Sequence, residues 1–196
     1  MTLSIHEFAT SRGFKPEELE YYGIEVRQDD TIIIPVLGRR GSWYERTYHP
    51  GGSPKYRSPK GSEAHLYNPH GFGPHSSQVW IAEGEWDTLS LLVCGAPALG
   101  IQGTKTFNKH WALLFQSAEV VLALDPDEEG DRTADKLAPL FPNTRRFRVP
   151  PPYEDVNDWL QKDRDGLTEM VQSNINVQAE WPAPILSKIS TLGATQ

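Results

Sequence analysis

Two aspartates, Asp125 and Asp127, stand one residue apart directly after the apolar run 120–124, and Gly130 follows three residues later. The run has the length and the β-branched content of a buried parallel strand. Carboxylates two residues apart at a strand end can reach the same metal ion. The alternative is an acidic turn that only caps the following helix. The D-x-D spacing alone does not separate these two interpretations.

Two further predicted strands also lead into acids. Glu83 follows the first of these strands immediately, and Asp87 lies four residues on, in the first turn of an expected helix. Asp155 belongs to the acidic segment 154–158 after the last strand. The carboxyl ends of parallel strands meet at one sheet edge, so we expect these acids to converge there. Clustered carboxylates repel unless cations neutralise them, and all-oxygen ligation favours Mg²⁺ or Mn²⁺ over zinc.

The elements that position these acids alternate between strand and helix from residue 79 onward, which predicts an α/β fold with a parallel four-stranded sheet flanked by helices. Gly84 permits a sharp turn after Glu83. The segment 100–105 combines glycines with Lys105, which suits a close approach to phosphate. The predicted strands are 79–82, 97–100, 120–124 and 145–149, and the predicted helices are 86–94, 108–116, 131–141 and 156–162.

The segment before residue 77 has a different pattern and predicts a small α+β lobe with basic character. Residues 49–76 are rich in Gly, Pro and His, and we interpret them as a long functional loop. The expected domains are 1–76, 77–162, and a C-terminal helix and tail over 163–196. The lobe's predicted helices are 4–11 and 16–22, and its predicted strands are 24–27, 31–37 and 43–48.

Composition narrows the class of protein. A 196-residue chain with 38% hydrophobic residues and a formal net charge of −7 is typical of a globular protein with one sizeable core, or with one core and a smaller appended lobe. No apolar run approaches a membrane span of roughly 18 residues, so we expect an intracellular protein without membrane contact. The single cysteine, Cys94, excludes a disulfide framework and a cysteine zinc site. The histidines 49, 65, 70 and 75 match no zinc spacing either.

Charge is distributed unevenly along the chain. Residues 39–60 carry six basic side chains and one acid, whereas 17 acids and 10 basic residues follow from Gln78 onward. This asymmetry fits a protein that holds a polyanion on one region and metal ions on another. The candidates for binding nucleic acid or nucleotide phosphates are Arg46, Lys55, Arg57, Lys60, Lys105 and Lys109.

The residues that carry the acids match a known family. Glu83-Gly84 after one strand and Asp125-x-Asp127-x-x-Gly130 after another resemble the TOPRIM domain of primases, topoisomerases and certain nucleases. EGEWDTLSLL, ALDPDEEG and EDVNDWL are most similar to phage and mitochondrial primase-helicases, within the DnaG-type primase group. The upstream segments SRGFKPEELEYYGIEVRQDDTIIIPV and KYRSPKGSEAHLYN resemble the small lobe that precedes TOPRIM in those primases.

The resemblance implies a DNA primase catalytic core that joins ribonucleotides on a single-stranded DNA template in a metal-dependent reaction. Asp125 and Asp127 would bind Mg²⁺ or Mn²⁺, with Asp87 and Asp155 as further ligands. Glu83 would serve as a general base or as another ligand. The implied partners are template DNA, nucleoside triphosphates and a replicative helicase in cis or in trans, in a phage or bacterial replication context.

The chain departs from the family pattern in ways that keep two alternatives open. Glu154 stands where the family often has a lysine, and the cysteine zinc module of many primases is missing. No G-x-x-x-x-G-K-[ST] motif for a helicase motor occurs. A metal-dependent TOPRIM nuclease would use the same acids, and a non-catalytic nucleic-acid-binding module would need a partner. The recognition sequence, the primer length and the oligomeric state do not follow from the sequence.

Overall fold

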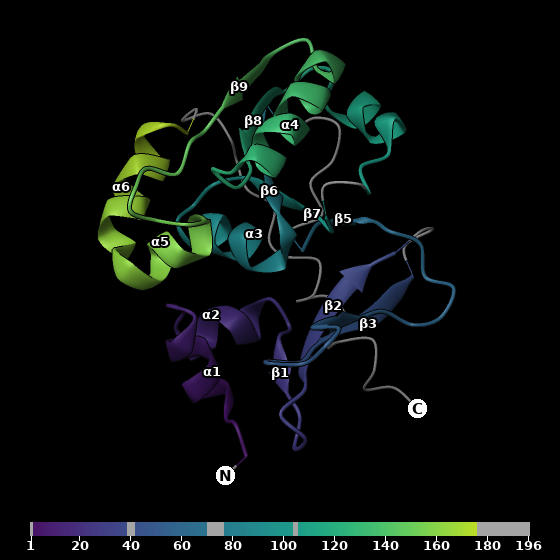
Figure 1. Ribbon diagram of the computed structural model, residues 1–196, viewed down its shortest axis with the longest axis vertical. Coiled ribbons are helices and arrows are strands. Elements are labelled where there is room, and N and C mark those ends of the chain that lie inside the picture. The colour runs from purple at the N-terminus through teal and green to yellow at the C-terminus, as the bar shows by residue number, and fades with distance from the viewer. Residues whose placement is uncertain (1, 39–41, 70–76, 104–105, 176–196) are drawn as a thin grey trace. The chain divides into compact units, whose positions relative to one another are not determined.

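The computed structural model (Figure 1) describes residues 2–38, 42–69, 77–103 and 106–175. These residues form two compact units. The first holds the described residues up to His65, and the second holds Leu66–Asn68 together with the described residues from Ser77 onward. No helix among the described residues is both long enough and apolar enough to cross a membrane. The predicted C-terminal tail lies beyond residue 175 and so outside the described residues.

The first unit combines two short helices with an antiparallel sheet. Helix α1 (Ile5–Ser11) begins with a capping box between Ser4 and Glu7, and α2 (Pro16–Tyr21) begins at a proline that suits the first helical turn. The sheet has the order β1-β2-β3-β4. Its strands are β1 (Glu25–Val26), β2 (Ile32–Leu37), β3 (Trp43–Tyr48) and β4 (Tyr56–Arg57).

The second unit is built on a five-stranded sheet of order β5-β7-β6-β8-β9. Four of its strands are parallel to one another, and β5 pairs antiparallel with β7 at one edge. The central strand is fully buried except at its last residue, Glu83. The strands are β5 (Leu66–Tyr67), β6 (Gln78–Glu83), β7 (Ala98–Ile101), β8 (Glu119–Ala123) and β9 (Thr144–Arg146).

Helices cover the sheet on both sides. Right-handed crossovers place α3 (Gly84–Val93), which joins β6 to β7, on one face, and α4 (Glu128–Leu137), which joins β8 to β9, on the other. The 3₁₀ helix η2 (Lys109–Phe115), between β7 and β8, shares the face of α4. A second short 3₁₀ helix, η3 (Ala138–Leu140), follows α4, while α5 (Val156–Lys162) packs against α3 and α6 (Arg164–Ser173).

The sheet of the second unit has five strands where we expected four. The additional strand, β5, forms within segment 49–76, which we interpreted as a loop. Strands β4 and β5 each contain only two residues, which is too short to show an alternating pattern in the sequence. Tyr67 in β5 is nevertheless buried, with 1% of its surface exposed, so this edge strand belongs to the core.

Some boundaries and one helix type also differ from the expected ones. Helix α4 begins at Glu128 instead of residue 131, because Asp127 accepts a hydrogen bond from the backbone N–H of Gly130 and so caps the helix earlier. Segment 109–115 is a 3₁₀ helix instead of an α-helix, and β9 ends at Arg146 instead of residue 149.

Candidate active site

The first acid of the site stands at the junction of β6 and α3. Glu83 ends the strand and precedes Gly84, whose φ of +79° lies in the left-handed region that a side chain would disfavour. The Gly84 carbonyl accepts a hydrogen bond from Thr88 Oγ1 at 2.6 Å. A Cβ atom on Gly100 of β7 would lie 2.5 Å from that Oγ1 and 2.7 Å from the Gly84 carbonyl oxygen. Gly100 therefore allows close packing of the protein's own backbone beneath Glu83.

A second close approach shapes the end of β8. A Cβ atom on Gly130 would lie 2.1 Å from the backbone oxygen of Asp125, so only glycine lets the first turn of α4 reach that carbonyl. Asp127 Oδ1 accepts from the Gly130 N–H at 2.7 Å. Helix capping and metal binding, which the sequence presented as alternatives, are therefore compatible. The cap uses one carboxylate oxygen of Asp127, and the other remains available.

Asp155 and Asp87 come together through α5. Asp155 caps this helix by accepting from the Asp158 N–H, as Asp127 caps α4. The preceding backbone N–H, that of Asn157, donates to Asp87 Oδ1 at 2.8 Å, and the Asn157 side-chain amide donates to Ser90 Oγ at 3.0 Å. Asn157 is buried and was not recognised as a site residue from the sequence. It holds the start of α5 against α3.

The acids of the site raise one another's pKa values, and this effect is clearest at Asp125. Burial, followed by repulsion from Glu83, Asp155 and Asp127, raises the pKa of Asp125 to about 7. Burial first, then Asp155 and Asp125, raises the pKa of Asp87 well above its usual value. The acids that the sequence predicted thus lie close enough to oppose one another's ionisation. Such a site favours an added cation.

Burial also raises the pKa of Glu83, and the next largest contributions come from Asp127 and Glu129. Glu129 is exposed in the first turn of α4 and was not among the residues singled out from the sequence. The sequence could have indicated Glu129, because it lies two residues after Asp127, in the first turn of the helix that follows the D-x-D pair.

Arg146 is a third residue of the site that sequence reasoning missed, after Asn157 and Glu129. Its Nη2 donates to the backbone oxygen of Asp125 at 2.8 Å and lies 3.3 Å from Asp131 Oδ1. Its Nε and Nη1 are buried, and no hydrogen-bond partner for them occurs within the part of the chain that the structure describes. Arg146 lowers the pKa values of Glu83 and Asp125, although in both the contributions that raise the pKa are larger.

The basic candidates divide between the two units. Lys109 begins η2 in the second unit and is exposed, whereas Lys105 lies outside the described residues. In the first unit, the Arg46 guanidinium lies 4.6 Å from the centroid of the Tyr56 ring, which itself belongs to the neighbouring strand. Lys55, Arg57 and Lys60 are exposed around that strand. Arg46 and Tyr56 thus place a cation and an aromatic face together.

The donor set fits a hard divalent cation. The candidate ligands are all carboxylates, and Asp87, Asp127 and Asp155 each use one oxygen for a backbone N–H and keep the other. Among the described residues, no three His, Cys, Asp or Glu side chains already stand in a ready-made metal-binding arrangement. The fit therefore rests on ligand chemistry and on the mutual repulsion that a cation would relieve.

A parallel sheet whose carboxyl edge carries clustered acids defines a class of α/β domains, and comparison with known proteins gives the family. Residues 80–160 match the model of the Toprim-like family. The Gene 57 protein of Mycobacterium phage D29 is 33% identical over 122 residues, which span 61% of this chain and 80% of that protein. The chain belongs to the Toprim-like family.

Solved structures share the fold at low sequence identity. The primase fragment of the bacteriophage T7 primase-helicase aligns with a TM-score of 0.64 and 18% identity, over 83% of this chain and 72% of that one. The Aquifex aeolicus primase, with zinc-binding and RNA polymerase domains, aligns with a TM-score of 0.63 and 17% identity, over 85% of this chain and 55% of that one. The mixed α/β fold is therefore similar to that of these primases.

Proposed function

We propose that this chain is a DNA primase catalytic core, which synthesises short RNA primers on single-stranded DNA during replication. The observation that carries the proposal is the cluster of carboxylates at the sheet edge, where burial, followed by repulsion from the neighbouring acids, raises the pKa of Asp125 to about 7. Membership of the Toprim-like family and the likeness to primase folds support the same activity. The substrates would be nucleoside triphosphates and a DNA template.

Each acid has a role that follows from its position. Asp125 and Asp127 would hold Mg²⁺ or Mn²⁺ through carboxylate oxygens that no helix cap uses, and Asp87 and Asp155 would complete the set. A bound divalent ion at this position would activate the attacking 3′-hydroxyl and neutralise the departing pyrophosphate. Glu83 would accept the hydroxyl proton, because a pKa raised by burial and by Asp127 brings a carboxylate closer to the range of an efficient base near neutral pH.

The basic residues of the first unit would bind the phosphates of the template or of the incoming nucleotide. Lys55, Arg57 and Lys60 are exposed and would draw affinity from counterion release. Arg46 would act with Tyr56, whose ring could stack on a base while the guanidinium pairs with a phosphate. Lys105 remains a candidate from its sequence position alone. A replicative helicase, joined covalently or supplied in trans, would deliver the template.

Cleavage is the rival activity, since a TOPRIM nuclease would use the same acids with water as the nucleophile. The basic lobe and the KYRSPKG segment favour synthesis, because a polymerising site must hold a template and a triphosphate at once. A non-catalytic accessory module would bind DNA without changing it.

One experiment separates these activities. The protein is incubated with single-stranded DNA, labelled ribonucleoside triphosphates and Mg²⁺ or Mn²⁺, and both the new RNA and the DNA are resolved by length. Short labelled RNA supports a primase, shortened DNA supports a nuclease, and binding without either product supports an accessory module.

Two variants test the site assignment in the same assay. Asp127→Asn keeps an oxygen to cap α4 but removes the charge, and Glu83→Gln removes the proposed base. We expect each to lower primer synthesis by roughly 10²- to 10⁴-fold with an unchanged circular dichroism spectrum. Glu128→Gln, an exposed neutralisation in the first turn of α4, is the matched control and should retain activity. Full activity of Asp127→Asn would contradict the assignment.

A further inference from the structure

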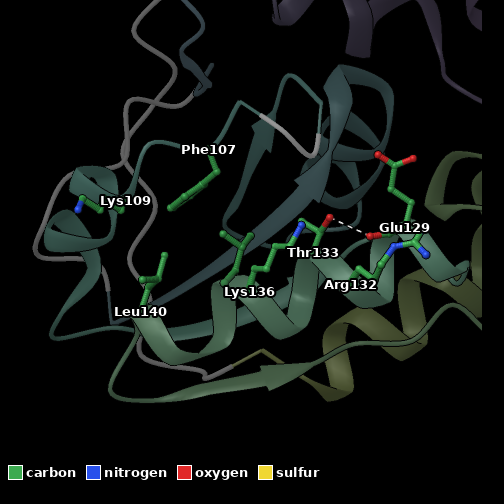
Figure 2. Close-up of a pocket in the computed structure, with 8 residues that line it drawn as sticks. Phe107, Lys109, Glu129, Arg132, Thr133, Lys136 and Leu140 are labelled. Carbon is green, nitrogen blue, oxygen red and sulfur yellow. Dashed lines mark hydrogen bonds between the residues drawn. The ribbon is translucent and has the colours of Figure 1, made fainter.

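A groove lies between η2 and α4, outside the acid cluster and on the same face of the sheet as the start of α4 (Figure 2). It encloses about 560 Å³, which is enough for one nucleotide unit. Its floor is apolar, with Leu137 buried and Leu140 half-buried. The remaining lining residues are Phe107, Lys109, Glu129, Arg132, Thr133 and Lys136.

Cations flank the groove from two separate elements. Lys109 projects from η2, while Arg132 and Lys136 lie one turn apart along α4, a rise of about 6 Å. All three are exposed. Arg132 forms an ion pair with Glu128 at 3.2 Å in which both side chains are largely in water, so that pair contributes little and yields easily to a phosphate.

An aromatic ring completes the arrangement. Phe107 is half-buried and lies edge-on to Trp111 at 5.4 Å and to Phe141 at 6.2 Å between centroids. These contacts fix the ring at the groove, and Figure 2 shows it between Lys109 of η2 and the side chains of α4. An apolar floor, a fixed aromatic ring and cations spread along one wall are the features with which proteins bind single strands irrespective of sequence.

We propose that this groove binds a single-stranded nucleic acid, with a base against Phe107 and its phosphates beside Lys109, Arg132 and Lys136. Three cations and the carboxylate of Glu129 suit a row of singly charged phosphates better than the concentrated charge of a free triphosphate. Glu129 also connects the groove to the acid cluster, since it raises the pKa of Glu83. The bound nucleic acid would run along α4, from the acids at the start of this helix toward Lys136 in the last turn of the helix.

The proposal deepens the primase hypothesis and rests on it for the identity of the strand, but its test does not require synthesis. Binding of a fluorescent oligothymidylate is measured by anisotropy in EDTA, without nucleotides, over a series of salt concentrations. If the chain binds DNA here but makes no primers, the primase proposal fails alone. If it makes primers while the groove variants bind normally, the groove proposal fails alone.

The charge variant is Arg132→Gln with Lys136→Gln. We expect about tenfold weaker binding at low salt, and a dependence of log K on log salt that is shallower by about 1.4, because each single-strand phosphate contact contributes about 0.7. The matched control is Lys162→Gln with Arg164→Gln, which removes the same charge from α5 and α6, elements that pack with α3. Equal affinity and equal slope for the two double variants would overturn the proposal.

Phe107→Leu tests stacking separately. We expect a loss of roughly 5- to 100-fold in affinity with an unchanged salt slope, because a base–aromatic contact carries no counterion term. Photocrosslinking of a 5-iodouracil oligonucleotide then locates the base, and the peptide that contains Phe107 should carry the adduct. Adducts confined to peptides of the first unit would overturn the assignment. So would displacement of the oligonucleotide by a free nucleoside triphosphate at equal phosphate concentration, since that result indicates a nucleotide pocket.

Discussion

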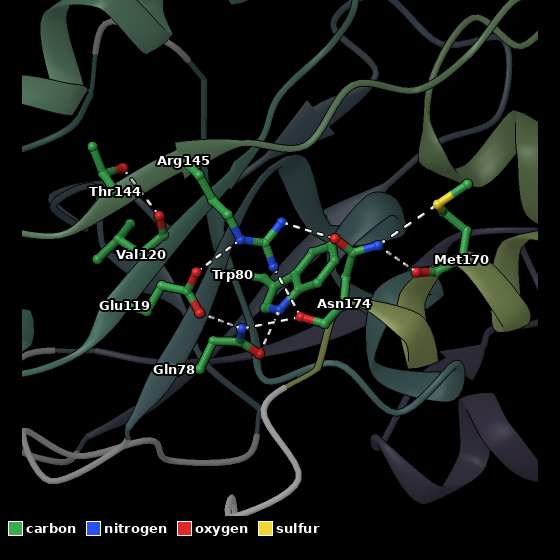
Figure 3. Close-up of polar contacts among 8 residues, drawn as sticks. All are labelled: Gln78, Trp80, Glu119, Val120, Thr144, Arg145, Met170 and Asn174. Atoms are coloured by element: carbon green, nitrogen blue, oxygen red, sulfur yellow. Dashed lines mark hydrogen bonds and ion pairs between the residues drawn. The ribbon is translucent and has the colours of Figure 1, made fainter.

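The two ends of the central sheet handle charge in opposite ways. At the amino end, Glu119 of β8 accepts hydrogen bonds from Gln78 at 2.7 Å and from Arg145 at 2.8 Å (Figure 3). Arg145 also donates to the side-chain and backbone oxygens of Asn174 at the end of α6. Burial raises the pKa of Glu119, but the bonds from Gln78 and Arg145 outweigh it and leave this pKa lowered. Here each charge has a partner.

At the carboxyl end of the same strands, charges face charges of the same sign. Burial and the neighbouring acids raise the pKa of Asp125 to about 7, and they also raise the pKa of Asp87 well above its usual value. The two ends of the sheet therefore differ in their effect on stability. The paired charges at the amino end stabilise the fold, whereas the carboxylates at the carboxyl end repel one another, and a bound cation would relieve that repulsion. Three substitutions test this difference, from the largest expected effect to the smallest.

Gly130→Ala should have the largest effect, because its Cβ would lie 2.1 Å from a backbone oxygen that cannot move without displacing Asp125. We expect a loss of about 3 kcal/mol in the free energy of unfolding, measured by urea denaturation, and loss of any activity of the site. Asp135→Ala in the same helix is exposed and should stay within about 0.5 kcal/mol of the parent. An unperturbed Gly130→Ala protein would show that the close approach does not exist in solution.

Arg145→Met should come next, since it removes the donor to Glu119 Oε1 and to Asn174 Oδ1 at a half-buried site and leaves Glu119 with its hydrogen bond from Gln78. The expected loss is about 2 kcal/mol in the free energy of unfolding, with metal-dependent activity retained in the folded fraction. Arg148→Met removes a more exposed arginine that pairs with Asp131, and should cost less than about 1 kcal/mol. If both variants lose the same stability, the amino-end network is no more than a surface ion pair.

Asp125→Asn should have the smallest effect on stability, and it should be stabilising. A folded-state pKa raised to about 7 makes ionisation of Asp125 unfavourable, so the metal-free parent loses stability as pH rises from about 4 through 7. The variant lacks this loss and should be more stable by about 1 kcal/mol at pH 8, after allowance for solvent screening. Below pH 4 the difference vanishes, because the carboxyl is protonated in both states.

The comparison is made by thermal unfolding in EDTA at pH 4 and pH 8, with Asp135→Asn as the control for a neutralised exposed acid. Adding Mg²⁺ at pH 8 should stabilise the parent and reduce the difference. A variant that is less stable than the parent at pH 8 would show that the carboxyl end does not store repulsion.

The alternation of strands and helices was predictable because it follows from apolar runs such as 120–124 and from the turns after them. The two-residue strands β4 and β5 were not, because two residues carry no period and pair only through tertiary contacts. The start of α4 was predicted three residues too late for a local reason. Asp127 caps the helix but lies outside the apolar pattern, so in the sequence it looks like part of the preceding turn.

The candidate site was predictable in its acids but not in what holds them. Glu83, Asp125 and Asp127 could be predicted because each stands at or just after the end of an apolar run that reads as a buried strand. Arg146 and Asn157 escaped notice, since their roles depend on segments far away in the chain: Arg146 on the Asp125 carbonyl and Asn157 on Asp87. A single sequence shows residue types but not which distant backbone groups they will meet.

The caps at Asp127 and Asp155 have a consequence for inheritance and engineering. Because each aspartate both starts a helix and would hold a metal ion, evolution can silence the site with one conservative change to asparagine without unfolding the protein. If the proposed activity and DNA binding hold, such an allele would make a stable, inactive chain that competes with an active copy for the same DNA. Alanine at the same position would remove a helix cap along with the charge, and would yield a recessive loss instead.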